Sequence, residues 1–222
     1  MATMRAITFA GLSGQLEGML HLPDSAPVAI AVVAHPLPTM GGTMENKIVT
    51  TLAKTFAELD FAALRFNFRG VGASSGVFDH GNGEVEDMLA AVQHARDSFG
   101  HLPLILAGFS FGGYVAARAA QHIHPQPHKL VLVAPAVGRF APSAGLSTDP
   151  STRLRTGMPP VAPDTLVIHG EQDEVIPLSD ALDWARPQQL PVVVLPEAGH
   201  FFHGRLHQIK QIVLKEFNGC RL

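Results

Sequence analysis

Short, continuous apolar runs alternate along this sequence with longer stretches in which apolar residues recur at helical spacing. Apolar runs of strand length are typical of strands buried on both faces, and their alternation with helices predicts an α/β fold with a mostly parallel sheet. The first two runs alternate only weakly and are separated by Gly11 and Gly14, which predicts an opening antiparallel hairpin. The strand-like segments are 5–9, 15–22, 28–35, 61–68, 102–109, 129–135, 164–170 and 191–196.

The stretches between these strands include five predicted helices. In 83–99 the apolar residues fall on one face, and Glu84, Glu86 and Asp87 lie in the first turn, where negative charge suits the helix dipole. With 222 residues the chain has the length of one α/β domain, so we expect a single domain over residues 1–222. The predicted helices are 43–59, 83–99, 111–121, 178–186 and 202–217.

Charge and composition exclude several classes of protein. The formal net charge is −3, so the basic surface of a nucleic-acid-binding protein is absent. The single cysteine, Cys220, allows no internal disulfide. The cluster of His122, His124 and His128 contains no carboxylate or cysteine, so we expect these to be solvated loop histidines. We expect no metal and no cofactor. No apolar run approaches the roughly 18 residues that a membrane helix needs. We expect a cytoplasmic monomer or homodimer.

A Gly-Phe-Ser-Phe-Gly-Gly sequence, residues 108–113, ends the strand-like run 102–109 and opens an Ala-rich helical stretch. A GxSxG string arises by chance, but a strand before it and a helix after it are the context of a nucleophile elbow. Such a turn strains the backbone at Ser110, and the neighbouring chain passes so close that only Gly108 and Gly112 fit. The alternative is a Gly-rich turn that merely packs a helix on a strand. We interpret Ser110 as a nucleophile.

A serine hydroxyl needs a base to take its proton, and the chain offers 12 histidines. His200 follows the last predicted strand and precedes the last predicted helix, at the sheet edge where the functional loops of open α/β sheets lie. His203 and His207 are rivals, but helical spacing places them inside that last helix. We therefore predict His200 as the general base.

The acid that orients this histidine is expected in the loop after the strand-like run 164–170, where Glu171, Asp173 and Glu174 compete. The turn at Gly170 places Asp173 at the crest of the loop, and its short side chain holds an imidazole more rigidly than a glutamate. We predict that Asp173 fixes the tautomer of the histidine and stabilises its imidazolium.

Hydrolysis by such a serine needs N–H donors for the developing negative charge. We assign the backbone N–H of Phe111, directly after the nucleophile, and that of Leu37, in the loop after the run 28–35. Pro36 and Pro38 have no N–H, so Leu37 is the only donor at the head of that loop, and the prolines would stiffen it. The alternative is that the prolines only turn the chain.

Two further groups of residues leave alternatives open. Phe109, Phe111, Phe201 and Phe202 flank the predicted catalytic residues and either line an acyl pocket or pack the core. The glycine- and serine-rich stretch 69–76 lacks the Lys-Ser/Thr of a P-loop and the spacing of a dinucleotide fingerprint. We interpret it as a structural loop in which Arg69 pairs with a nearby carboxylate.

In the order Ser110, Asp173, His200, these motifs resemble the α/β-hydrolase superfamily over nearly the whole chain. HPLPTMGGTMENK, LRFNFRGVGASSG and FDHGNGEVEDM are similar to small bacterial members described as dienelactone-hydrolase-like or predicted esterases. The resemblance implies an eight-stranded sheet with an antiparallel second strand. Larger relatives insert a cap after the sixth strand. The corresponding Pro-rich stretch 136–163 is too short for one, which implies a capless member with this stretch as a candidate functional surface.

The resemblance also implies a reaction. Dienelactone hydrolases carry cysteine at the nucleophile position, and dehalogenases and epoxide hydrolases carry aspartate, so serine at position 110 argues against those activities. We expect a serine esterase that cleaves small carboxylic esters through an acyl-enzyme on Ser110. The alternatives are a peptidase-like or acyltransferase activity with the same catalytic triad, and a non-catalytic binding protein, although a binding protein has no need of the intact set.

Overall fold

A computed structural model describes residues 3–138 and 157–218, whose strands form one eight-stranded sheet in the order β1-β2-β4-β3-β5-β6-β7-β8. The second strand is antiparallel to both neighbours and the other neighbouring pairs are parallel, as predicted. The strands are β1 (Thr3–Gly11), β2 (Gly14–Leu22), β3 (Ala29–Ala34), β4 (Phe61–Phe66), β5 (Leu104–Phe109), β6 (Lys129–Val133), β7 (Leu166–Gly170) and β8 (Val192–Leu195).

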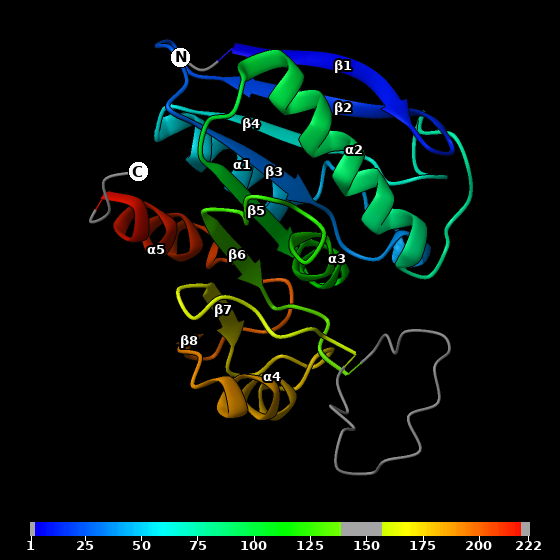
Figure 1. The fold of residues 1–222 in the computed structure, drawn as a ribbon. Coiled ribbons are helices and arrows are strands. Elements are labelled where there is room, and N and C mark those ends of the chain that lie inside the picture. Colours follow the sequence, from blue (N-terminus) through cyan, green and yellow to red (C-terminus); the bar gives the residue numbers. More distant parts are fainter. Residues whose placement is uncertain (1–2, 139–156, 219–222) are drawn as a thin grey trace.

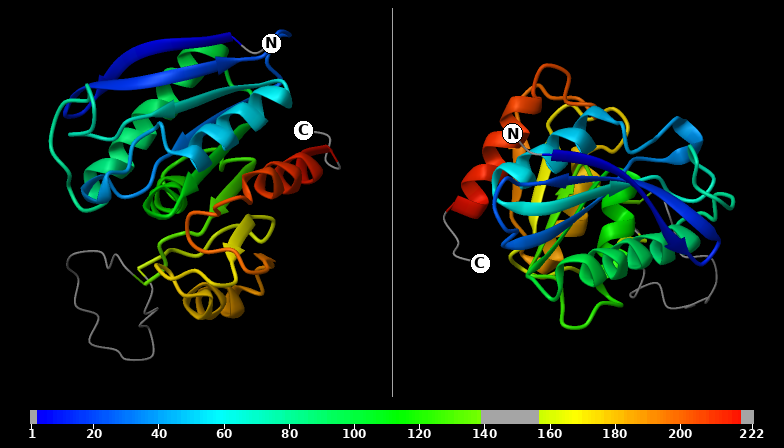
Figure 2. Two further views of the ribbon diagram at one scale, coloured as in Figure 1. Left: turned by 180° about the vertical axis from the view of Figure 1, so that it is seen from behind. Right: turned by 90° about the horizontal axis from the view of Figure 1, so that it is seen from above.

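Helices cover both faces of this sheet (Figure 1). The helices α2 and α3 lie on one face, and α1 and α5 lie on the other, as the view from behind also shows (Figure 2). The described α-helices are α1 (Lys47–Glu58), α2 (Asn82–Phe99), α3 (Phe111–Ala120), α4 (Leu178–Ala185) and α5 (Leu206–Asn218). Two short 3₁₀ helices span Pro38–Met40 and Arg186–Gln188.

The double covering explains why the central strands are continuous apolar runs rather than alternating ones. All six residues of β3 are buried. The side chain of Val32 packs in the core layer beneath α2 and α3, and that of Val33 packs in the layer beneath α1 and α5. Burying one such side chain stabilises the fold by about 1.5–3 kcal/mol, so both faces of these strands contribute to folding.

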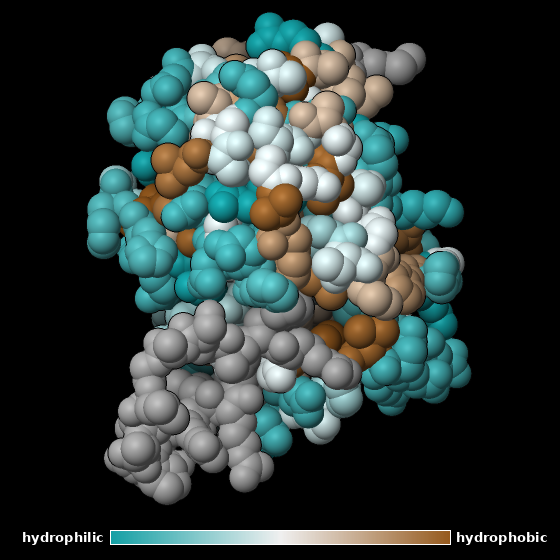
Figure 3. Space-filling view, turned by 90° about the vertical axis from the view of Figure 1, so that its right-hand side faces the viewer, coloured by the Kyte–Doolittle hydropathy of each residue, from teal (hydrophilic) through white to brown (hydrophobic). Residues whose placement is uncertain are grey.

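The parallel register brings the carboxyl ends of several strands to one edge of the sheet. Ala34 at the end of β3 pairs with Gly108 on β5, and Gly170 at the end of β7 pairs with Leu195 on β8. The arrows of β3 and β5 point toward the right-hand side of Figure 1. Seen from that side, hydrophobic side chains are scattered among hydrophilic ones (Figure 3). The loops that carry the predicted site residues all begin at this edge.

The structure corrects some predicted boundaries. The first helix begins at Lys47 rather than at residue 43, because the Asn46 side chain accepts the N–H of Ile48 and caps it there. The last helix begins at Leu206, so His203 lies before it and not inside it, whereas His207 is helical. Most of the Pro-rich stretch, residues 139–156, lies outside the described residues, as does Cys220. Within the described ranges, no helix is long and apolar enough to cross a membrane.

Candidate active site

Ser110 lies in the sharp turn between β5 and α3, and the structure shows why glycines flank it. The Ser110 backbone has φ 53° and ψ −117°, a region that residues with a Cβ rarely adopt. A Cβ on Gly108 would lie 2.2 Å from the backbone of Gly112, and one on Gly112 would lie 2.3 Å from the carbonyl oxygen of Ala34. The two glycines therefore let the turn pack directly against β3, with the Ser110 hydroxyl at the carboxyl edge of the sheet.

The ring of His200 reaches this hydroxyl from the loop after β8. Its Nε2 lies 3.0 Å from Ser110 Oγ. The imidazole is 3% exposed and packs between the rings of Phe109 and Phe201, with ring centroids 5.0 and 5.2 Å away. Aromatic packing on two sides leaves the ring little freedom to turn away from the serine.

Asp173 contacts the other nitrogen of the same ring. Its Oδ2 lies 2.8 Å from His200 Nδ1, and its Oδ1 accepts the N–H groups of Val175 and Ile176 at 2.9 and 2.7 Å. Burial alone would raise the pKa of Asp173, but the hydrogen bonds from His200 and from these two amides outweigh it and hold the pKa below its ordinary value. Ionised Asp173 accepts a hydrogen bond from Nδ1–H, so Nε2 is left unprotonated and can accept the proton of Ser110.

The two competing carboxylates in this loop have other partners. Glu171 accepts the N–H of Glu197, and Glu174 accepts the backbone N–H of His200 at 3.1 Å. Both side chains are exposed. The structure therefore places Asp173, and neither glutamate, in contact with the imidazole. Glu174 instead ties the loop after β7 to the loop that carries His200.

Both predicted oxyanion donors border the same cavity as Ser110. Leu37 begins the 3₁₀ turn after β3, and within the described residues its N–H has no hydrogen-bond acceptor. Phe111 is the first residue of α3 and directly follows Ser110, so its backbone N–H lies at the N-terminus of the helix beside the nucleophile turn. The cavity has a volume of about 700 Å³, and Leu37, Phe111, Ser110 and His200 are among its lining residues.

The four phenylalanines whose role the sequence left open differ in whether they line this cavity. Phe111 and Phe201 line the cavity, whereas Phe109 and Phe202 do not and are fully buried. Phe201 is 47% exposed and Met40, another lining residue, is 82% exposed, so the cavity has an apolar but open rim. Glu174 adds a carboxylate to the wall.

Sequence reasoning missed two buried histidines beside these residues. His169 on β7 has Nε2 2.9 Å from the carbonyl oxygen of Ile176 and 3.5 Å from Asp173 Oδ2, and burial lowers its pKa. His35 directly follows β3 and contacts Pro36 and Phe68. The available signal was a polar residue at the carboxyl end of an otherwise apolar run, since a buried polar group must have partners.

The other polar residues singled out in the sequence lie in ion pairs or on the surface. Arg69 forms a bidentate ion pair with the buried Asp87, at 2.8 Å for the shortest contact, as predicted for this loop. His122, His124 and His128 are exposed. In the described part of the chain, no group of three or more histidines, cysteines or carboxylates is arranged to hold a metal ion.

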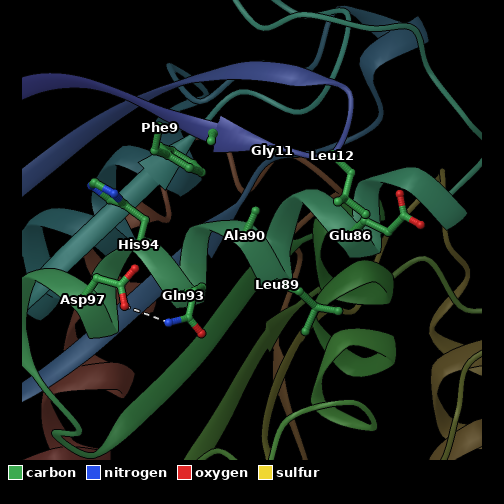
Figure 4. Close-up of a pocket in the computed structure, with 10 residues that line it drawn as sticks. Phe9, Gly11, Leu12, Glu86, Leu89, Ala90, Gln93, His94 and Asp97 are labelled. Carbon is green, nitrogen blue, oxygen red and sulfur yellow. Dashed lines mark hydrogen bonds between the residues drawn. The ribbon is translucent and has the colours of Figure 1, made fainter.

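A second hollow, of about 620 Å³, lies between the end of β1 and α2 (Figure 4). His94 stacks on Phe9 there, with ring centroids 5.0 Å apart, and Gln93 donates to Asp97. Burial lowers the pKa of His94. No serine, threonine or cysteine is among the residues that line this hollow, so it offers no nucleophile comparable to Ser110.

Comparison with known proteins identifies the family and the fold of this chain. The family described as serine aminopeptidase, S33, matches residues 27–156. An α/β serine hydrolase without a lid from Xanthomonas campestris is 36% identical, with a TM-score of 0.83 over 97% of this chain and 94% of that one. A serine hydrolase homologue from Coxiella burnetii is 35% identical, with a TM-score of 0.80 over 96% and 97%. An uncharacterised protein of Rickettsia prowazekii is 28% identical over 95% of this chain and 87% of its own.

The family match spans more than half of the chain, and the two solved structures cover nearly all of it. Their TM-scores of 0.83 and 0.80 show that they share the overall fold described above for this chain. The chain therefore belongs to the S33 serine aminopeptidase family of the α/β-hydrolase superfamily, and its fold is that of the lidless serine hydrolases.

Proposed function

We propose that this protein hydrolyses small carboxylic esters through an acyl-enzyme on Ser110. One observation carries the proposal. The side chains of Ser110, His200 and Asp173 come from three separate loops and form an unbroken hydrogen-bonded chain, with distances of 3.0 and 2.8 Å. All three are buried, with exposures of 7%, 3% and 6%. A serine next to a histidine that a carboxylate orients is the arrangement that makes a hydroxyl nucleophilic.

The geometry supports a two-step reaction. Ser110 Oγ attacks the ester carbonyl carbon while its proton passes to His200 Nε2. The oxygen of the tetrahedral intermediate becomes negative and accepts the N–H groups of Leu37 and Phe111. When the carbon–oxygen bond to the alcohol breaks, the alcohol takes the proton from Nε2 and leaves an acyl group on Oγ.

Water then resolves the acyl-enzyme by the same route. It gives a proton to His200 Nε2 as its oxygen attacks the acyl carbon, and Ser110 Oγ regains that proton as the acid departs. Asp173 keeps its charge throughout and stabilises the imidazolium that forms twice in each cycle. The net change is one ester and one water converted to one acid and one alcohol.

A second candidate is cleavage of a peptide bond next to a free amine. The matched family is described by that activity, and the exposed carboxylate of Glu174 lies in the wall of the cavity, where it could pair with an ammonium group. Esters are the better candidate because the open, apolar rim formed by Met40 and Phe201 offers few polar groups to hold a peptide backbone.

Steady-state kinetics separate these functions. We expect p-nitrophenyl esters of short acids to be cleaved faster than aminoacyl p-nitroanilides. We expect Ser110→Ala to lower ester turnover by several orders of magnitude, since the remaining groups supply only about 10³–10⁴ over water. Ser179→Ala, an exposed serine on α4, is the matched control and should leave turnover unchanged. Faster cleavage of the anilides would favour the peptidase, and full activity in Ser110→Ala would refute the assigned nucleophile.

A further inference from the structure

His35 is a buried histidine at the end of β3 that the proposed reaction does not use. Its side chain is 0% exposed. The N–H of Phe68 donates to its Nε2 at 3.1 Å, and its Nδ1 lies 2.7 Å from the carbonyl oxygen of Pro36. Because an N–H can only donate and a carbonyl can only accept, Nε2 is the acceptor and Nδ1 carries the proton. The two backbone groups thus fix one neutral tautomer.

The bond to Pro36 sets the direction of the next N–H along the chain. The carbonyl of Pro36 and the N–H of Leu37 belong to one peptide unit. That unit is trans, since the only cis bond in the described ranges is His124–Pro125. In a planar trans peptide the C=O and N–H point in opposite directions. With the Pro36 oxygen held by the buried ring, the Leu37 N–H points away from the core, on the side where Leu37 lines the cavity.

The prolines alone do not fix this direction. A proline ring sets φ of Pro36 but leaves its ψ free, and rotation about ψ of Pro36 together with φ of Leu37 flips the peptide between them. The hydrogen bond from His35 restrains that rotation. Further along the turn, the carbonyl of Leu37 accepts the N–H groups of Met40 and Gly42 at 3.1 and 3.0 Å, which holds the following peptide in place.

The same stretch of backbone lies against the nucleophile turn. A Cβ on Gly112 would lie 2.3 Å from the carbonyl oxygen of Ala34 and 2.7 Å from that of His35. The ring of His35 packs on Phe68, with centroids 4.5 Å apart, and Phe68 packs edge-on to Phe111 at 5.7 Å. Leu37 and Phe111, the two oxyanion donors, therefore sit on backbone segments in direct contact.

From these contacts we infer that His35 is a positioning residue for the oxyanion hole: its Nδ1–H holds the Pro36–Leu37 peptide in the orientation that aims the Leu37 N–H at the substrate oxygen. The inference rests on the proposed hydrolysis at Ser110. Burial lowers the pKa of His35 to about 4, so the ring keeps its neutral tautomer near neutral pH. His35 itself does not touch the substrate.

Substitution of His35 tests the inference through the split between kcat and KM. His35→Phe removes both hydrogen bonds, and we expect kcat for p-nitrophenyl acetate to fall on the order of 10²–10³, the loss seen when one oxyanion donor is removed. KM and the midpoints of the kcat/KM pH profile should not change, because Asp173 and His200 keep their contacts. His35→Asn can still donate an amide N–H to Pro36, so it should recover part of the lost kcat.

The matched control is His21→Phe. His21 is another buried histidine, 1% exposed on β2, whose Nε2 accepts Arg65 Nε and which does not line the cavity. We expect this variant to lose stability but to keep kcat. An equal loss of kcat in His21→Phe, or wild-type kcat in His35→Phe, would overturn the role of His35 and leave Ser110 chemistry intact. If the wild type does not turn over esters, the proposed function fails, and this inference fails with it.

A measurement on the unmodified protein covers the case in which the variants do not fold. Nitrogen NMR of the imidazole distinguishes its two neutral tautomers. The inference requires a proton on Nδ1 and none on Nε2 of His35 at neutral pH. A proton on Nε2 alone would mean that the ring cannot donate to the Pro36 carbonyl, and it would overturn the inference.

Discussion

Asp173 and Glu174 are neighbours in one loop, yet they bind different parts of His200. Asp173 contacts the imidazole through Oδ2, whereas Glu174 accepts the backbone N–H. The sequence favoured Asp173 because the Gly170 turn places a short side chain at the crest of the loop. It did not reveal the contacts of His169 with Ile176 and Asp173, because a histidine inside an apolar run gives no sign of which groups it will contact.

Substitution of the three acidic residues of this loop tests the assignment at the residue scale. Asp173→Asn is isosteric but favours the wrong tautomer of His200 and cannot stabilise its imidazolium, so we expect kcat to fall on the order of 10⁴. Glu171→Gln and Glu174→Gln remove exposed charges and should change kcat by less than about tenfold. Ester hydrolysis at one pH where the wild-type rate no longer rises compares all three. If Glu174→Gln lowered kcat strongly and Asp173→Asn lowered it only slightly, the acid would have to be reassigned to Glu174.

The sequence predicted the order and type of the elements more accurately than it predicted where each element begins and ends. Every predicted strand and helix exists, because buried runs and amphipathic stretches differ in period. The predicted start of α5 at residue 202 was wrong because of tertiary packing. Phe202 is fully buried with φ 48°, a left-handed conformation that an α-helix cannot contain, so the chain turns before Leu206. Periodicity alone cannot show such a turn.

At the scale of elements, the contact between α3 and β3 leaves no room for an added methyl group at Gly112. The Cβ of Gly112→Ala would meet backbone oxygens of Ala34 and His35, which cannot rotate away. We expect this variant to lose at least 1–3 kcal/mol of stability, by analogy with overpacked cores, and to lose kcat because both oxyanion segments move apart. Gly113→Ala is the milder comparison in the same turn, since a Cβ there would lie 3.2 Å from Pro135, and we expect it to lose less stability than Gly112→Ala. Similar melting temperatures for Gly112→Ala and the wild type would contradict the described packing.

On the scale of the whole molecule, the sequence predicted the sheet and the edge at which the site lies. Alternating strands and helices allow few topologies, and parallel strands place their carboxyl ends together. The loops were harder to predict. Whether Leu37 borders the cavity depends on a turn held by Gly42 and on the bond from His35, and neither follows from residue type. The positions of Met40 and Phe201 at the rim depend on the same loops.

Stability of the whole molecule should depend on pH through His35. Its pKa is about 4 in the folded protein, against about 6.5 when unfolded. Between these values the unfolded chain binds a proton that the folded protein does not, so this contribution is complete above about pH 6.5 and is lost as the pH falls toward about 4. At about 1.4 kcal/mol per unit, the loss is on the order of 3 kcal/mol.

Urea unfolding across this pH window measures the effect. His35→Phe has no titrating ring at this position, so its stability should fall less steeply with acidification than that of the wild type. The remaining groups, including His21 and Asp173, are common to both proteins and drop out of the difference. Parallel pH dependences would show that His35 titrates alike in the folded and unfolded states, which its burial does not allow.

Covalent labelling tests most directly whether Ser110 is the nucleophile. A fluorophosphonate reacts with an activated serine and places an oxygen where the oxyanion would form, so it reports the nucleophile, the base and the oxyanion donors together. We predict one adduct on the folded protein, located by peptide mass spectrometry on Ser110 and absent from Ser110→Ala. An unlabelled wild type, or an adduct on another serine, would contradict the assignment of Ser110.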